Sequence, residues 1–300
     1  MKVVVAGGTG FMGRYIVRSL LDAGHEVTVL GRRGDNSGIP QLAGADATKG
    51  DVTQPESLRG KLDGADAVVG AVAFPNFPVE VPRKGLTFDN YDRKGTENLL
   101  AEASRAGVGK YVYVSGAGAD PMSPVVWYRA KGRAEDAIKA SGIDYGIVRP
   151  SWAYGPEDKA LNKFVQIARF SPIVPRIGLK RQEIQPIYVK DVAASVERLF
   201  AREAWNKTFE VGGLDVMSMD AVIRTMLKVM GKRRLIVPIP TILPKIAMAP
   251  LTLLPSPPMS PSGIEFAVQD GLVDTTMMEK ELDVHPVPLE EGLSNYLGAR

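Results

Sequence analysis

The first half of the chain alternates short apolar runs, rich in β-branched residues, with longer stretches in which apolar residues recur at helical spacing. The short runs predict strands and the longer stretches predict helices. Strands separated by helices of this length need crossover connections, so the pattern predicts an α/β fold with a doubly wound parallel sheet. The expected strands are Lys2–Ala6, Glu26–Leu30, Asp46–Lys49, Ala67–Ala71, Lys110–Ser115 and Tyr145–Arg149, and the expected helices are Met12–Ala23, Glu56–Leu62, Asp92–Ala106 and Val126–Ala140.

Local signals predict where some of these helices begin and end. Thr53–Glu56 has the residue types of a capping box and predicts a helix start. Gly24 follows the first helix, where a glycine ends a helix at low cost. Beyond residue 150 the pattern loosens. Its predicted elements are a strand at Gln185–Val189, a helix capped by Asp191 and running to Phe200, a strand at Lys207–Val211, and a helix at Met219–Met230 capped by Ser218.

These patterns divide the chain into two expected units. Residues 1–150, joined by about 185–200, form the sheet domain, and residues 151–300 form a smaller, partly discontinuous domain for a substrate or a partner.

A glycine-rich run lies between the first expected strand and the first expected helix. Its spacing satisfies both G-x-x-G-x-x-G and G-x-G-x-x-G. Glycines there allow a tight turn, let the backbone approach a pyrophosphate and permit close helix packing, while the helix N-terminus attracts phosphate. The run predicts a Rossmann-type domain for a nicotinamide dinucleotide, and the alternative is a glycine turn without a ligand. The residues of the run are Gly7, Gly8, Thr9, Gly10, Phe11, Met12 and Gly13.

The end of the second strand favours NADPH over NADH. Sites that prefer NAD place an acidic residue there, whereas this chain has Arg32 and Arg33, whose guanidinium groups can clamp a 2′-phosphate. The alternative is that both arginines are surface charges and that Asp35 turns back to bind ribose, with NAD(H) as the cofactor.

Two further stretches are expected beside the nucleotide. Asp51 and Val52 follow the third strand, where a carboxylate can accept a hydrogen bond from the adenine amino group. Ala71, Val72 and Ala73 form a small apolar turn that suits close approach of the backbone to the nucleotide. Either stretch could instead serve packing alone.

Composition excludes several chemistries. The chain has no cysteine, so it offers no disulfide, thiolate nucleophile or cysteine-held metal site. Its two histidines, His25 and His285, belong to no cluster with ligand spacing, so no metal is expected. With 37 basic and 34 acidic residues, the balance gives no reason to expect nucleic acid as a partner. The N-terminus lacks the layout of a secretory signal, so we expect a cytoplasmic location.

Several motifs together resemble the extended and atypical short-chain dehydrogenases/reductases. Within that superfamily, other segments are most similar to the group of the 39-kDa accessory subunit of respiratory complex I. The resemblance implies NADPH binding and places Pro150 beside the cofactor, and several members of the group are not known to turn a substrate over. The superfamily segments are Gly7–Gly13, Gly50–Val52, Gly95–Leu100, Tyr111–Ser115, Arg149–Ser151 and Tyr188–Ala193, and the group segments are Val114–Pro121, Gly155–Asp158 and Val237–Pro240.

The chain departs from this family at the catalytic helix. Active members use a Ser or Thr with a Tyr and a Lys spaced Y-x-x-x-K on one helix face. Here Lys131 is in place, as a ribose ligand and candidate catalytic residue, but Trp127 stands at the tyrosine position and cannot act as a general acid or base. Tyr128 is a neighbour at i, i+3 and offers a shifted mechanism or simple packing. Ser115 is the candidate hydroxyl near the nicotinamide, although the usual position lies one or two residues later.

The sequence of the C-terminal third predicts its function less clearly than that of the first half. Trp152, Tyr154, Arg176 and Tyr188 could line a pocket or belong to the core. Residues 235–262 are apolar, follow three basic residues and contain repeated prolines that interrupt a spanning helix. The segment is expected to cover the substrate cleft or dock on a partner, with shallow binding to a membrane surface as an alternative.

Three functions remain open from the sequence. One is an NADPH-dependent oxidoreductase for a bulky apolar carbonyl, enone or quinone-like compound. Another is a catalytically silent NADPH-binding assembly or regulatory protein. A nucleotide-sugar epimerase or dehydratase fits worst, because it needs the intact tyrosine.

Overall fold

A seven-stranded parallel sheet forms the centre of the protein. The computed structural model describes residues 1–242 and 269–298, and in it the strand order is β11-β6-β5-β4-β1-β2-β3. This order confirms the predicted doubly wound α/β fold, because it reverses direction between β1 and β4. The strands are β1 (Lys2–Ala6), β2 (Glu26–Gly31), β3 (Asp46–Lys49), β4 (Ala67–Gly70), β5 (Lys110–Val114), β6 (Asp144–Pro150) and β11 (Lys207–Val211).

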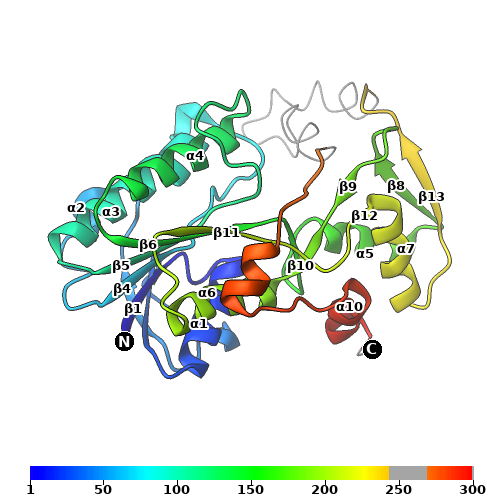
Figure 1. Ribbon diagram of the computed structural model, residues 1–300. Coiled ribbons are helices and arrows are strands. Elements are labelled where there is room, and N and C mark those ends of the chain that lie inside the picture. Colours follow the sequence, from blue (N-terminus) through cyan, green and yellow to red (C-terminus); the bar gives the residue numbers. More distant parts are fainter. Residues whose placement is uncertain (243–268, 299–300) are drawn as a thin grey trace.

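Helices cover both faces of this sheet, as Figure 1 shows. Successive residues of a strand point to opposite faces, so Val3 and Val5 join one buried cluster while Val4 and Ala6 join the other. An apolar run without polar alternation is therefore what a strand buried on both faces requires. The helices are α1 (Phe11–Asp22) and α6 (Val189–Ala201) on one face, and α2 (Pro55–Leu58), α3 (Gly95–Arg105) and α4 (Val126–Lys139) on the other.

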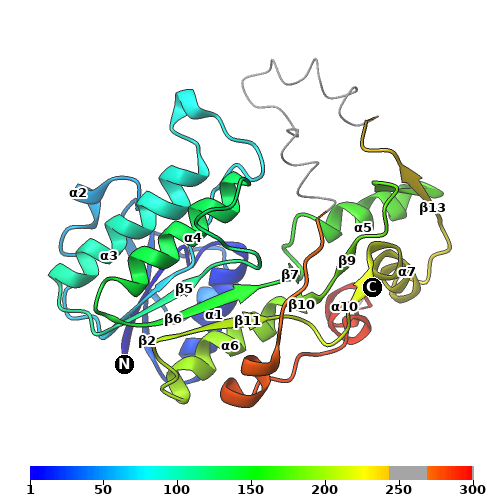
Figure 2. The ribbon, with the colours of Figure 1, turned by 45° about the horizontal axis from the view of Figure 1, so that its top comes forward.

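The rest of the described chain forms a smaller unit beside the sheet (Figure 2). Three two-stranded sheets and three helices build it, and its last helix returns to pack on α7. Its elements are β7 (Trp152–Tyr154) with β10 (Pro186–Tyr188), β9 (Glu183–Ile184) with β12 (Met217–Ser218), β8 (Ile173–Ile177) with β13 (Leu235–Ile239), α5 (Leu161–Phe170), α7 (Met219–Val229) and α10 (Leu289–Leu297). Short helical turns belong to the sheet domain instead, and these are η1 (Pro40–Leu42), η2 (Pro82–Lys84), η3 (Asp89–Lys94) and η5 (Met278–Leu282).

Two predicted helix caps are wrong and two helix ends are confirmed. The Thr53–Glu56 capping box does not form, because the hydroxyl of Thr53 donates to Asp51 and α2 is a single turn. Asp191 is not the cap of α6, since that helix already begins at Val189. Ser218 does cap α7 by accepting from the Ala221 amide at 3.2 Å, and Gly24 adopts a left-handed φ of 81° after α1.

The sheet domain reaches further along the chain than expected. The strand at Lys207–Val211 was predicted, but it pairs with β6 in the main sheet rather than in the smaller unit. The expected helix Asp92–Ala106 begins instead with η3, a π-helical turn.

The apolar segment 235–262 is only partly described. Its first residues form β13, and residues 243–268 lie outside the described part of the chain. Within residues 1–242 and 269–298, no helix has the length and hydropathy needed to cross a bilayer.

Candidate functional site

The glycine loop between β1 and α1 lies at the carboxyl end of the sheet, where this fold binds ligands. Gly7 has a φ of 83°, and a Cβ there would lie 2.6 Å from the Ala71 carbonyl oxygen. A Cβ on Gly13 would lie 2.2 Å from the Gly7 carbonyl oxygen. Helix α1 begins directly after Gly10 with no side-chain cap. These glycines let backbone amides at a helix N-terminus approach a ligand, so the loop fits a dinucleotide pyrophosphate.

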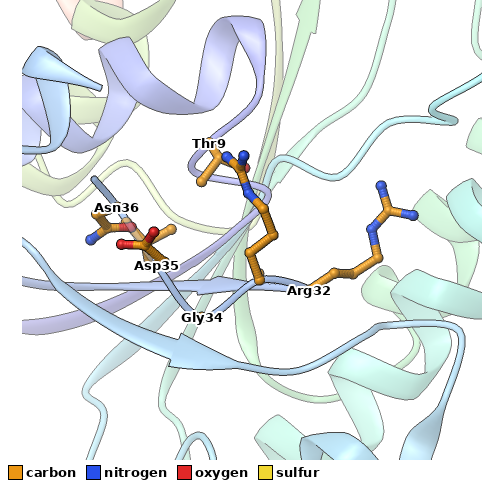
Figure 3. A pocket seen from close by; sticks show the side chains of 8 residues that line it. Thr9, Arg32, Gly34, Asp35 and Asn36 are labelled. Carbon is orange, nitrogen blue, oxygen red and sulfur yellow. The ribbon is translucent and has the colours of Figure 1, made fainter. Parts of the chain in front are cut away.

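A cavity of about 500 Å³ opens beside this loop at the end of β2. Thr9, Arg32 and Arg33 line it together with Asp35. In Figure 3 the Arg32 side chain extends on the opposite side of Gly34 from Asp35 and Asn36. The cavity thus places two cations beside the glycine loop, and their contact with a 2′-phosphate stays a prediction.

The carboxylate of Asp35 is already engaged. It accepts from the Ser37 amide at 2.8 Å and from the Ser37 hydroxyl at 2.6 Å, and these bonds lower the pKa of Asp35. These contacts orient the Asp35 carboxylate toward Ser37, and the choice between NADP(H) and NAD(H) stays a prediction.

The two stretches expected beside the nucleotide follow β3 and β4 at the same edge of the sheet. The Ala71 turn packs directly against Gly7, with Val72 half-buried and Ala73 exposed. One carboxylate oxygen of Asp51 accepts from the Thr53 amide at 2.9 Å and from its hydroxyl. Val52 is buried. The contact of Asp51 with adenine and that of the Ala71 turn with the nucleotide stay predictions.

Lys131 forms an ion pair that the sequence did not predict. Its ammonium lies 3.0 Å from Asp92, whose side chain is only 1% exposed, and 5.4 Å from the centre of the Tyr113 ring. Burial works against the charge, but Tyr113 and Asp92 outweigh it and hold the pKa of Lys131 above its ordinary value. Lys131 is therefore a fixed cation. The clue in the sequence was an acidic residue on the turn that leads into the Gly95–Leu100 motif.

The two aromatic residues before Lys131 form a stack. The rings of Trp127 and Tyr128 lie 3.9 Å apart at 30°, and Phe77 meets Trp127 edge-on. The Tyr128 ring also packs against Gly118, whose φ is 77°. Burial raises the pKa of Tyr128, which is opposite to what a tyrosine that exchanges protons near neutral pH needs. The structure therefore favours a packing role for Tyr128.

Ser115 belongs to a buried polar cluster. Its hydroxyl donates to Glu135 at 2.6 Å, and Arg149 binds the same carboxylate with two hydrogen bonds of 2.9 and 2.6 Å. Because the proton of Ser115 points to Glu135, this contact argues against its use on a substrate carbonyl. Pro150 follows on β6, and its carbonyl accepts from the Ala117 amide, which fixes the loop after β5.

Of the four suggested pocket residues, three are buried. Tyr154 and Tyr188 are buried with ring centres 5.5 Å apart, and Arg176 is buried in an ion pair with Asp220 at 2.8 Å. Trp152 is half-buried on β7.

The fold and the glycine loop together define a dinucleotide-binding protein on a doubly wound sheet. Residues 7–171 match the model of a family described as NAD(P)H-binding, and the chain belongs to that family. It is an NAD(P)H-binding protein whose sequence is similar to mitochondrial complex I subunits.

Individual proteins illustrate this relationship. The chain is 28% identical over 95% of its length to an Arabidopsis thaliana protein named NADH dehydrogenase (ubiquinone) 1 alpha subcomplex subunit 9, mitochondrial, covering 74% of that protein. It is 29% identical over 65% of its length to a ceramide reductase of Caulobacter vibrioides, covering 59% of it. A dTDP-glucose 4,6-dehydratase of Streptomyces venezuelae shares the fold, with a TM-score of 0.78 over 99% of this chain and 96% of that chain, at 21% identity.

Proposed function

We propose that the protein binds NADP(H) as a lasting ligand and uses it to stabilise one conformation for a partner protein, without a tyrosine–lysine proton relay. One observation carries the second half of this proposal. The lysine that would assist a catalytic tyrosine is paired with Asp92, and the residue four positions before it is Trp127.

The preference for NADP(H) is supported by charge at the end of β2. A 2′-phosphate adds negative charge where Arg32 and Arg33 line the cavity, and Asp35 is bound to Ser37. Arginine suits this task because its planar guanidinium can bind a phosphate with two hydrogen bonds.

A second candidate is an NADP-dependent oxidoreductase for a bulky apolar carbonyl, enone or quinone-like substrate. Its support is the aromatic cluster of Phe74, Phe88 and Tyr91, against which Trp127 packs one helical turn from Lys131. Phe77 extends this cluster and is 45% exposed. The ceramide reductase among the relatives acts on an apolar compound according to its name. The function of an epimerase or dehydratase is supported only by the similarity of this fold to that of such enzymes.

One experiment separates the two candidates. Purified protein is mixed with NADPH, and the cofactor absorbance is followed with a panel of apolar ketones, enones and quinones, while thermal melting is recorded with and without NADPH. We expect NADPH at a hundredfold excess over Kd to add roughly 2.7 kcal/mol to the free energy of unfolding and so to raise Tm. We expect no oxidation of NADPH above the rate without protein.

Turnover in the wild type that is lost in Tyr128→Phe would contradict the proposal and establish the shifted-tyrosine mechanism. Turnover that appears only in Trp127→Tyr would support it, since it would show that the missing tyrosine is what keeps the site silent. A Tm that NADPH does not change would contradict the proposed binding of NADP(H).

A further inference from the structure

The charges of the chain are balanced in number but not in position. Residues 159–182 and 221–239 contain eleven Lys and Arg residues and no Asp or Glu. The whole chain has 37 basic and 34 acidic residues, so the remainder is net acidic.

The fold brings these two segments together. The first forms α5 and β8, the second forms most of α7 and all of β13, and β8 pairs with β13 so that Ile173 lies opposite Leu235. The Leu235 amide donates to the Pro172 carbonyl at 2.9 Å, and Arg234 donates to the Ala168 carbonyl at 2.9 Å. This pair of strands lies at the end of the molecule away from the seven-stranded sheet (Figure 1).

Large apolar side chains are exposed at the same place. Phe170 is 89% exposed, Leu235 64% and Ile173 45%. Isolated exposed apolar residues are ordinary, but three neighbours on paired elements form a patch. We call the group of Arg169, Phe170, Ile173, Lys232, Arg233 and Leu235 the α5–β13 surface.

The cations of this surface form no ion pair with an acidic residue of the described part of the chain. Among the described residues, Arg169, Lys232 and Arg233 take part in no ion pair, whereas Lys228 on α7 is paired with Glu290 at 2.7 Å. The arrangement therefore combines net positive charge with protruding apolar side chains.

We propose that the α5–β13 surface docks the protein on a membrane surface that contains anionic lipids. Phe170 and Leu235 would enter the boundary between headgroups and acyl chains, while Arg169, Lys232 and Arg233 meet the lipid phosphates. A nucleic acid would use the cations but would gain nothing from Leu235. The α5–β13 surface and the cofactor cavity share no residue. Membrane docking therefore goes beyond the proposed function and is tested independently of it.

The test is co-sedimentation of the full chain with vesicles, with and without NADPH. Vesicles of phosphatidylcholine alone are compared with vesicles that also contain phosphatidylglycerol, at low and high salt. We expect binding to the mixed vesicles only, weakened by salt. Lys232→Glu with Arg233→Glu should weaken it at least about 25-fold, since each cation near an anionic surface is worth roughly fivefold in affinity. Phe170→Ser with Leu235→Ser should weaken it about tenfold or more.

The control carries the same change of charge on the far side of the sheet. Arg59 and Lys61 are exposed beside α2, and Arg59→Glu with Lys61→Glu should leave vesicle binding unchanged. Circular dichroism melts of every variant check that the fold is retained.

Three results would overturn the proposal. One is equal binding to both kinds of vesicle, or to neither. Another is loss of binding in the α2 control equal to that in the Lys232 and Arg233 variant. The third is tight binding to a duplex DNA oligonucleotide that the charge reversals abolish and the serine variant leaves intact, which would assign the surface to nucleic acid.

Discussion

The substitution Asp92→Asn tests the ion pair that fixes Lys131. Asp92 is almost fully buried and Lys131 is only 12% exposed, so the variant leaves a cation inside the protein without its anionic partner. Asparagine keeps the size and one acceptor of the side chain, and the change therefore isolates the charge. The hydroxyl of Thr96 donates to the Asp92 backbone carbonyl, and that bond is unaffected.

Removal of one partner from a buried ion pair costs roughly 3–5 kcal/mol. The Lys131 ammonium also lies over the Tyr113 ring, which retains part of its stabilisation, so we expect a loss near 3 kcal/mol. For a protein of this size, 1 kcal/mol lowers Tm by about 2–4 °C. The variant should therefore melt roughly 6–12 °C below the wild type.

The difference in Tm between the wild type and Asp92→Asn should change with pH in a definite direction. In the wild type the pKa of Lys131 is raised above its unfolded value, so the stabilisation is fully present below about pH 10 and is lost only above that. In Asp92→Asn, burial opposes the charge of Lys131 while Tyr113 alone still raises its pKa, so this pKa is lower than in the wild type. The destabilisation caused by the unpaired charge therefore decreases once pH rises past that lowered pKa. The difference in Tm between the two proteins should be constant near neutrality and become smaller toward about pH 10.

Thermal melts by circular dichroism measure this difference, and a double-mutant cycle with Lys131→Met completes the test. Asp92→Asn with Lys131→Met should recover most of the lost stability, because an uncharged pair leaves no buried charge. A loss below about 1 kcal/mol, or a double variant less stable than Asp92→Asn, would refute the reasoning.

The remaining predictions concern the glycine loop and one acidic residue. Gly13→Ala should weaken NADPH binding at least about tenfold, because its Cβ would collide with the Gly7 carbonyl. The control is Gly109→Ala, which should bind NADPH as the wild type does, since the atom nearest to a Cβ at Gly109 lies 4.0 Å away. Equal NADPH affinities of the two variants in a fluorescence titration would contradict the role of the loop. Burial raises the pKa of Asp191 to about 6, above its unfolded value, so the native state loses stability as pH rises through that value. Asp191→Asn keeps an acceptor for the Val287 amide and should raise Tm at about pH 8 but not near pH 4, and a gain of equal size at both pH values would show that charge is not its cause.

The fold was predictable because its signals are local. Apolar runs and helical periodicity gave the strands and helices of the sheet, with ends that differ by a few residues. The position of β11 was not predictable in the same way, because its apolar pattern marks a strand without saying which strand it pairs with. The cap at Thr53 failed because its hydroxyl donates to Asp51, and the cap at Asp191 failed because α6 already begins at Val189.

The site was predictable only where the chemistry is contiguous in sequence. The glycine loop and the arginines after β2 are single runs, and both border one cavity. The partners of Lys131 and Ser115 lie 39 and 20 residues away, and no periodicity connects them. The basic residues before Leu235 already indicated a membrane surface as an alternative partner of that segment. The contribution of α5 and β8 was not predictable, because the two basic segments meet only in the folded chain.

The most direct test of the cofactor assignment is a titration with NADPH and NADH, followed by tryptophan quenching, for the wild type and for Arg32→Ala with Arg33→Ala. A charged hydrogen bond contributes about 1.5–3 kcal/mol, so the wild type should bind NADPH at least roughly tenfold more tightly than NADH. The variant should lose that preference while its affinity for NADH stays the same. Alanine at Arg59 and Lys61 removes two exposed cations elsewhere and should change neither affinity. Equal or tighter binding of NADH by the wild type, or a preference that survives in the variant, would contradict the assignment of the arginines to a 2′-phosphate.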